Sequence, residues 1–158
     1  CAKYRKGHFE GVIDVMDRLT KIILPNKIFM GEKDFQQLYL VKKHIKKKNN
    51  CKIIACRTIR DRNYLALSSR NFSLKKKELI KASRFTKDLV RFKKNLKFKK
   101  DINKIINVKK ILLSKSYGIK IEYLELRKKS NLSISSDIKN SNLFFAYYIR
   151  NTRLIDNV

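Results

Sequence analysis

The feature that most constrains the fold is a short apolar run that leads through a glycine into a helical pattern. Ile28, Phe29 and Met30 form the run, and Gly31 follows them. Beyond Gly31, apolar residues recur at helical spacing, at Phe35, Leu38, Val41 and Ile45. We therefore predict a strand over 27–30, a sharp turn at Gly31 and a helix that reaches about Lys48.

This strand–helix pair lies between two further elements. An amphipathic helix is predicted over 10–23, ended by Pro25, and a second strand over 51–56. Helix, strand, helix and strand in this order favour a parallel sheet with crossover helices. Ligands in such sheets bind beyond the carboxyl ends of the strands, where Gly31 and Ile59 are expected.

The character of the chain changes near residue 59. A polar connector precedes the segment LALSSRN (65–71), and helices are predicted over 76–94 and 102–115. Ser73 is the expected N-cap of the first of these, and Gly118 the turn residue after the second. Three strands, at 119–126, 143–150 and 152–156, would form a small antiparallel sheet. The fold class predicted is α/β, with a domain built on the parallel sheet at 1–58 and a small α+β domain with an antiparallel sheet at 59–158.

Two segments carry chemistry suited to phosphate groups. GEKDFQQ (31–37) places Lys33 and Asp34 near the start of a helix, where unpaired N–H groups and the positive dipole end favour an anion. In the second segment the hydroxyls of Ser68 and Ser69 and the guanidinium of Arg70 supply donors that match phosphate oxygens. We predict that the two segments form two walls of one nucleotide site.

The charge of the chain allows a different interpretation. A net charge of +27 is typical of proteins that bind nucleic acid or anionic membranes. However, 29 of the 40 basic residues are lysines, and they are scattered along the chain. Arginine, which reads bases and phosphates better, is sparse. We expect solvated helix faces and no specific nucleic-acid partner, and keep a basic non-catalytic relic or nucleic-acid-binding protein as the alternative.

Other classes of site and environment have little support. No stretch approaches the roughly 20 apolar residues of a membrane span, so no membrane association is predicted. Three cysteines without a C-x-x-C pair suit a reducing cytoplasm. Cys51 and Cys56 are expected on opposite sides of the sheet, and their spacing with His44 fits no common zinc site, so no metal centre is predicted.

Four segments in a fixed order carry a family resemblance. GHFEGV (7–12), GEKDFQQ (31–37), LALSSRN (65–71) and TRLIDN (152–157) resemble the pantoate–β-alanine ligases, whereas 72–150 match only in general pattern. The resemblance implies a Rossmann-like nucleotidylyltransferase domain followed by a small lid domain. It also implies ATP-dependent condensation of pantoate with β-alanine through pantoyl adenylate, with release of pyrophosphate and AMP. ATP with Mg²⁺, pantoate and β-alanine are the implied ligands, and the complete enzyme is expected to be a homodimer.

The resemblance also assigns roles to residues. Lys33, Ser68 and Arg70 are the implied catalytic groups, and Gln37 is the implied pantoate ligand. The implied ATP contacts are Gly31, Glu32, Lys33, Asp34, Ile59, Leu67, Ser68, Ser69 and Arg70. Arg5 resembles an arginine at the mouth of the pantoate pocket, while His8 is interpreted as structural and His44 as a surface residue.

The chain departs from the family pattern at several points. The family's His-x-Gly-His signature, whose histidines contact the ATP phosphates, is absent, and the sequence opens on Cys1 in a segment that is internal in the family. We therefore expect the C-terminal part of the enzyme, unable to catalyse adenylation alone. In addition, the Asp-Gly that the family has before Leu-Ala is replaced by Asn63 and Tyr64, which trades an easy turn for a bulky ring.

Overall fold

A computed structural model describes residues 5–48, 51–96 and 101–158. Cys1 lies outside these residues. The chain divides into two compact units, unit 1 (Cys1–Thr58) and unit 2 (Ile59–Val158), and each is described by itself. In the described part of the chain no helix combines the length and apolar character needed to cross a bilayer.

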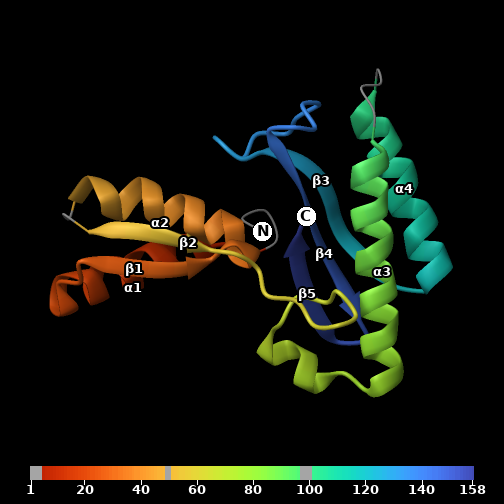
Figure 1. Cartoon of the computed structure of the whole chain (residues 1–158), viewed down its shortest axis with the longest axis horizontal. Helices are drawn as coiled ribbons and strands as arrows, with labels where there is room; N and C mark the ends of the chain where they lie inside the picture. The colour runs from red at the N-terminus through yellow and green to blue at the C-terminus, as the bar shows by residue number, and fades with distance from the viewer. Residues whose placement is uncertain (1–4, 49–50, 97–100) are drawn as a thin grey trace. The chain divides into compact units, whose positions relative to one another are not determined.

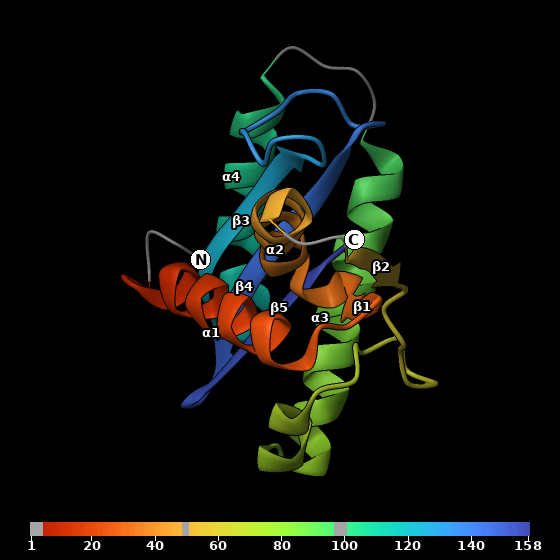
Figure 2. The same cartoon turned by 90° about the vertical axis from the view of Figure 1, so that its left-hand side faces the viewer.

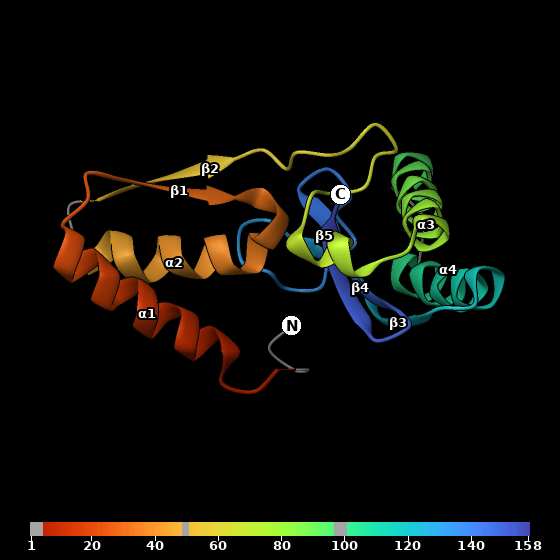
Figure 3. The same ribbon diagram turned by 90° about the horizontal axis from the view of Figure 1, so that it is seen from below.

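Unit 1 is a small parallel α/β layer. Helix α1 (His8–Ile23) leads to strand β1 (Lys27–Gly31), a 3-10 turn η2 (Glu32–Asp34), helix α2 (Phe35–Lys48) and strand β2 (Lys52–Cys56). The strands pair in parallel, with Lys27 opposite Lys52 and Gly31 opposite Cys56, so their carboxyl ends are level. Helix α2 lies between α1 and the two strands (Figure 3).

The core of unit 1 follows the predicted helical spacing. Leu38, Val41 and Ile45 on α2 are buried, as their spacing indicated. In contrast, large apolar side chains on and after α1 and on β1 are exposed: Val15, Leu19, Ile22, Ile23, Leu24 and Phe29. Unit 1 therefore carries exposed apolar surface on α1, just after it and on β1.

Unit 2 is a three-stranded antiparallel sheet covered by two helices. A 3-10 turn η3 (Ser69–Ser73) precedes helices α3 (Lys76–Asn95) and α4 (Ile102–Tyr117), and strands β3 (Lys120–Lys128), β4 (Ser141–Ile149) and β5 (Thr152–Asn157) follow. The strand order is β3-β4-β5. Both helices lie on the same face of this sheet (Figure 1 and Figure 2). The core between the helices and the sheet centres on Phe85, whose ring contacts those of Tyr117, Phe145 and Tyr147.

The fold confirms the predicted α/β class and the order of its helices and strands. Gly118 is the turn residue that the sequence indicated, with a φ of 55° that favours glycine. The predicted cap of α3 is wrong. Ser73 lies within η3, and the N-cap of α3 is instead Lys75, whose backbone N–H donates to the Glu78 carboxylate at 2.8 Å.

Candidate functional site

The GEKDFQQ segment begins at the carboxyl end of β1. Gly31 is its last strand residue, with φ −70° and ψ 134°. The predicted sharp turn at this glycine is wrong, because that conformation is extended and any residue adopts it. A Cβ built on Gly31 would meet nothing within 4 Å, so the backbone is open to close approach by a ligand.

Lys33 and Asp34 lie in the 3-10 turn that leads directly into α2. The Lys33 ammonium is 4.0 Å from the Asp34 carboxylate, and the Lys33 side chain is 19% exposed against 46% for Asp34. A lysine this sheltered has lost much of its conformational freedom, unlike the exposed lysines later on α2. Gln37 follows on the first turn of α2 and is half-buried.

The LALSSRN segment belongs to a folded loop of unit 2. The backbone N–H of Leu67 donates to the carbonyl of Ile59 at 3.0 Å, which brings these two residues side by side. Both carry exposed apolar side chains, Ile59 at 71% and Leu67 at 54%. An exposed apolar pair next to hydroxyls and a guanidinium suits the flat face and polar tail of a nucleotide.

Ser68, Ser69 and Arg70 follow at the start of η3. Ser68 is the N-cap, and its Oγ accepts a 3.3 Å bond from the backbone N–H of Arg70. The Arg70 guanidinium donates to the carbonyl of Arg153 on β5 at 2.7 Å. That bond uses one of five guanidinium N–H groups, and the exposed side chain of Arg70 can offer others to an anion.

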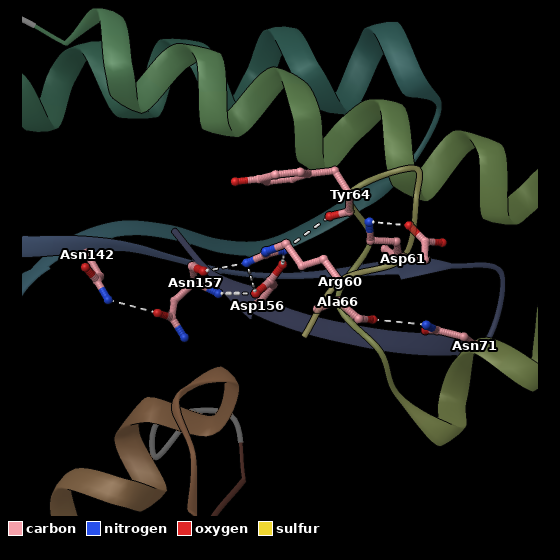
Figure 4. Close-up of polar contacts among 9 residues, drawn as sticks. Arg60, Asp61, Tyr64, Ala66, Asn71, Asn142, Asp156 and Asn157 are labelled. Atoms are coloured by element: carbon pink, nitrogen blue, oxygen red, sulfur yellow. Dashed lines mark hydrogen bonds and ion pairs between the residues drawn. The ribbon is translucent and has the colours of Figure 1, made fainter. Parts of the chain in front are cut away.

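A second arginine of this loop was missed by the sequence analysis. Arg60 forms two hydrogen bonds to the Asp156 carboxylate, at 2.6 and 3.0 Å (Figure 4). The Asp156 side chain is only 4% exposed. The sequence around Arg60 predicts only a polar connector, and Arg60 and Asp156 are separated by 96 residues. No local pattern signals such a pair.

Tyr64, which stands where the family has a glycine, adopts a backbone conformation that favours glycine. Its φ of 75° lies in the left-handed region, which a side chain with a Cβ rarely adopts. Two contacts offset that strain, since its carbonyl accepts a 3.3 Å bond from Arg60 and its ring lies 5.0 Å from the Arg60 guanidinium carbon.

Glu122 accepts several hydrogen bonds within the sheet through its carboxylate. A β-bulge between Ile121 and Tyr123 leaves it outside the β3–β4 register. Its carboxylate accepts bonds from Tyr148 at 3.1 Å and from Arg153 Nε at 3.2 Å. Burial by itself would raise the pKa of Glu122, but the bonds and charge of Arg153, aided by Tyr148, outweigh burial and hold it below 4.5.

This shift predicts acid sensitivity. Because the folded-state pKa of Glu122 is lowered, its contribution to stability is complete above the ordinary value of 4.5 and is lost as the pH falls through the folded value. We expect the Tm of unit 2 to fall more steeply below about pH 4.5 in the unmodified chain than in Glu122→Gln, measured by circular dichroism. Equal acid slopes in the two proteins would contradict this.

The remaining predicted residues are placed as follows. The Arg5 guanidinium lies 3.1 Å from the His8 ring nitrogen, and the His8 ring packs against Phe9, which supports a structural role for His8. His44 is exposed, as predicted. Cys51 is buried and Cys56 is exposed. Among the described residues no cluster of three His, Cys, Asp or Glu side chains could hold a metal ion.

The structure therefore gathers the candidate residues in two groups. Gly31 to Gln37 form one at the end of β1, and Ile59 with Leu67 to Arg70 form the other on the loop of unit 2. That the two groups face one cleft stays a prediction.

Comparisons with known proteins identify the family. The model of the pantoate–beta-alanine ligase family matches residues 1–158. Pantothenate synthetase of Flavobacterium psychrophilum is 38% identical over 99% of this chain and 56% of its own length. The bifunctional pantoate ligase/cytidylate kinase of Prochlorococcus marinus is 43% identical over the whole chain and 31% of its own length.

Solved structures agree with these relatives. Pantothenate synthetase of Thermus thermophilus superposes with a TM-score of 0.87 at 27% identity, over 99% of this chain and 58% of that one. The Francisella tularensis ligase, solved in complex with beta-gamma ATP and beta-alanine, gives 0.73 at 32% identity, over 99% of this chain and 52% of that one. This chain thus spans between half and three fifths of the pantothenate synthetases that it matches. By sequence and by fold, the chain belongs to the pantoate–beta-alanine ligase family.

Proposed function

We propose that this chain supplies the C-terminal portion of a pantoate–β-alanine ligase, with units 1 and 2 as the rest of the Rossmann-like domain and the lid. The observation that carries the proposal is the match of the family model to all of residues 1–158, with GEKDFQQ and LALSSRN both in ordered positions suited to ligand contact. The Francisella tularensis relative, crystallised with beta-gamma ATP and beta-alanine, supports the choice of ligands.

The proposed reaction has two steps. A carboxylate oxygen of pantoate attacks the α-phosphorus of ATP, and the bond to pyrophosphate breaks. The amine of β-alanine then attacks the acyl carbon of the pantoyl adenylate, AMP leaves with the bonding electron pair, and the amine loses a proton.

The residues of this chain would assist by binding and by neutralising charge. Lys33 and Arg70 would stabilise negative charge that develops on the phosphates, and the hydroxyls of Ser68 and Ser69 would hold phosphate oxygens. Ile59 and Leu67 would contact the adenine, and Gly31, Glu32 and Asp34 would complete the ATP site. Gln37, with both a donor and an acceptor on its amide, would hold pantoate.

Mg²⁺ would enter as part of the ATP complex. Mg²⁺ is commonly held by one or two carboxylates together with substrate phosphates, and its charge would neutralise the departing pyrophosphate. The exposed carboxylate of Asp34 fits such a single contact, whereas the described residues form no metal centre of their own. We also propose a cytoplasmic location and a homodimer for the complete enzyme.

The test compares this chain with a chimera. The chimera joins it to the part of the Flavobacterium psychrophilum enzyme that this chain does not match. We expect pantoate-dependent release of pyrophosphate from ATP by the chimera and none by the chain alone, because the family's phosphate-binding histidines are absent from this sequence.

Two outcomes would contradict the proposal. A folded chimera that neither binds ATP nor releases pyrophosphate would refute it. Nucleic-acid affinity that persists above about 0.5 M salt would favour the nucleic-acid-binding alternative, because purely ionic contacts are lost at that ionic strength. The comparisons do not favour that alternative.

A further inference from the structure

We infer that Arg60 is a positioning residue that fastens the loop 59–71 to strand β5, so that Ser68, Ser69 and Arg70 are presented in a preformed arrangement. The inference rests on the proposed function for the ligand that this arrangement serves. The anchoring itself rests only on contacts within unit 2.

The first observation is the geometry of the Arg60–Asp156 pair. Two parallel hydrogen bonds, at 2.6 and 3.0 Å, join the guanidinium to the carboxylate. The side chains are 15% and 4% exposed. Charge-assisted bidentate bonds away from solvent are among the strongest and most directional polar contacts in proteins. The pair therefore fixes both the distance and the orientation of the two backbone segments.

On the loop side, the chain is folded around the Arg60 side chain. Arg60 donates to the carbonyl of Tyr64, and its backbone forms an isolated antiparallel bridge with Ala66. Asp61 closes the turn between them, because its Oδ1 accepts from the backbone N–H groups of Asn63 and Leu65 at 2.9 and 2.8 Å. Figure 4 shows the bond from Arg60 to the Tyr64 carbonyl, with Asp61 and Ala66 on the same loop.

On the sheet side, the anchor continues into the core of unit 2. Arg60 also donates to the carbonyl of Asn157 at 3.2 Å, and the Asn157 side chain accepts from Asn142 on β4 at 2.9 Å. Asp156 and Asn157 pair with Phe145 and Phe144 of β4, both of which are buried. The guanidinium is therefore attached to β5, which pairs directly with the more buried strand β4.

The phosphate-type residues follow directly from this anchored loop. Leu67 is tied to Ile59, the Asn71 amide donates to the carbonyl of Ala66 at 3.0 Å, and Arg70 donates to the carbonyl of Arg153. Two arginines thus attach one loop to the same strand, Arg70 at residue 153 and Arg60 at residues 156 and 157. A lysine at position 60 would keep the charge but could not reproduce the planar two-pronged contact.

The first experiment measures backbone amide exchange by NMR in the full chain without ligand. In Arg60→Lys and Asp156→Asn we expect the amides of Leu65 and Leu67 to exchange faster by at least about tenfold, because charge-assisted bonds that hold the loop are lost. Amides of β4 should change by less than about twofold. Arg127→Lys is the matched control, since Arg127 on β3 also bonds a carboxylate, that of Glu125, and a carbonyl, that of Leu132 on the β3–β4 connection. It should leave the loop 59–71 unchanged.

Two results of this experiment would overturn the inference. One is unchanged exchange in the loop of both variants. The other is an equal acceleration of the loop and β4 amides, which would make the pair a general support of unit 2.

The second experiment titrates the same proteins with ATP and Mg²⁺ and follows the amide resonances of Ser69 and Arg70. We expect the Kd for ATP to rise by about tenfold in Arg60→Lys, since part of the binding free energy must then order the loop. Equal affinities in both proteins would overturn the inference. If the unmodified chain and the chimera both fail to bind ATP, the proposed function fails instead, while the exchange results still decide the anchoring.

Discussion

In the chimera, Lys33→Ala is expected to lower the rate of pantoate-dependent adenylation by about two to three orders of magnitude, the effect typical of removing one preorganised charge-stabilising group. Lys33 lies in the 3-10 turn that leads into α2, its side chain is 19% exposed, and its ammonium is 4.0 Å from the Asp34 carboxylate. Stopped-flow or steady-state measurement of pyrophosphate release would give the rate.

Lys43→Ala provides the matched control for this result. Lys43 lies on the same helix but is exposed, and its removal subtracts the same charge from the protein. We expect less than about a twofold change in rate, because exposed charges are screened by solvent and salt. A similar loss of activity in both variants would show that Lys33 acts only through net charge, contrary to the proposed role.

The second large effect is expected at the core of unit 2. Phe85 is fully buried, and its ring contacts three other aromatic rings. Phe85→Ala should lower the free energy of unfolding by about 3–5 kcal/mol, from lost burial and from the cavity that remains. In a unit of about 100 residues this corresponds to a fall in Tm of roughly 12 °C or more. Thermal unfolding followed by near-ultraviolet circular dichroism would measure it.

The control for this substitution is Phe72→Ala. Phe72 is 93% exposed in η3, so its truncation removes little buried surface. We expect a change within about 0.5 kcal/mol. A comparable loss of stability at both positions would mean that Phe85 does not hold the core together as the structure indicates.

Much of the fold could be predicted from local sequence patterns. The spacing of Leu38, Val41 and Ile45 placed the buried face of α2 correctly, and Gly118 marked the end of α4. Such signals are legible because helix periodicity and glycine turns depend only on neighbouring residues. The prediction of the α3 N-cap failed because two nearby residues could each accept hydrogen bonds from the start of the helix. Ser73 and Glu78 can both satisfy the N–H groups at the start of a helix, and the preceding η3 turn left that task to Glu78.

The residues of the candidate site could also be proposed from the sequence. GEKDFQQ begins at the end of the predicted strand β1, and LALSSRN follows the polar connector after β2. The side chains of both segments have the chemistry of phosphate binding. The role of Gly31 was misjudged, because a glycine after a strand suggests a tight turn, whereas here the chain stays extended. Gly31 borders open space, since even an added Cβ would meet no atom within 4 Å.

The amino-acid sequence by itself determined the order of helices and strands, the family and the positions of the two ligand-type segments, because each is written in residues close together in the chain. Only the tertiary structure decided how the second segment is held. Arg60 meets Asp156, and Glu122 meets Arg153, across 96 and 31 residues of intervening chain. Such pairs form because antiparallel strands, a bulge and a folded loop place charged residues that are distant in sequence next to one another and away from solvent. No periodic pattern of neighbouring residues indicates these long-range pairs, so only the folded structure shows them.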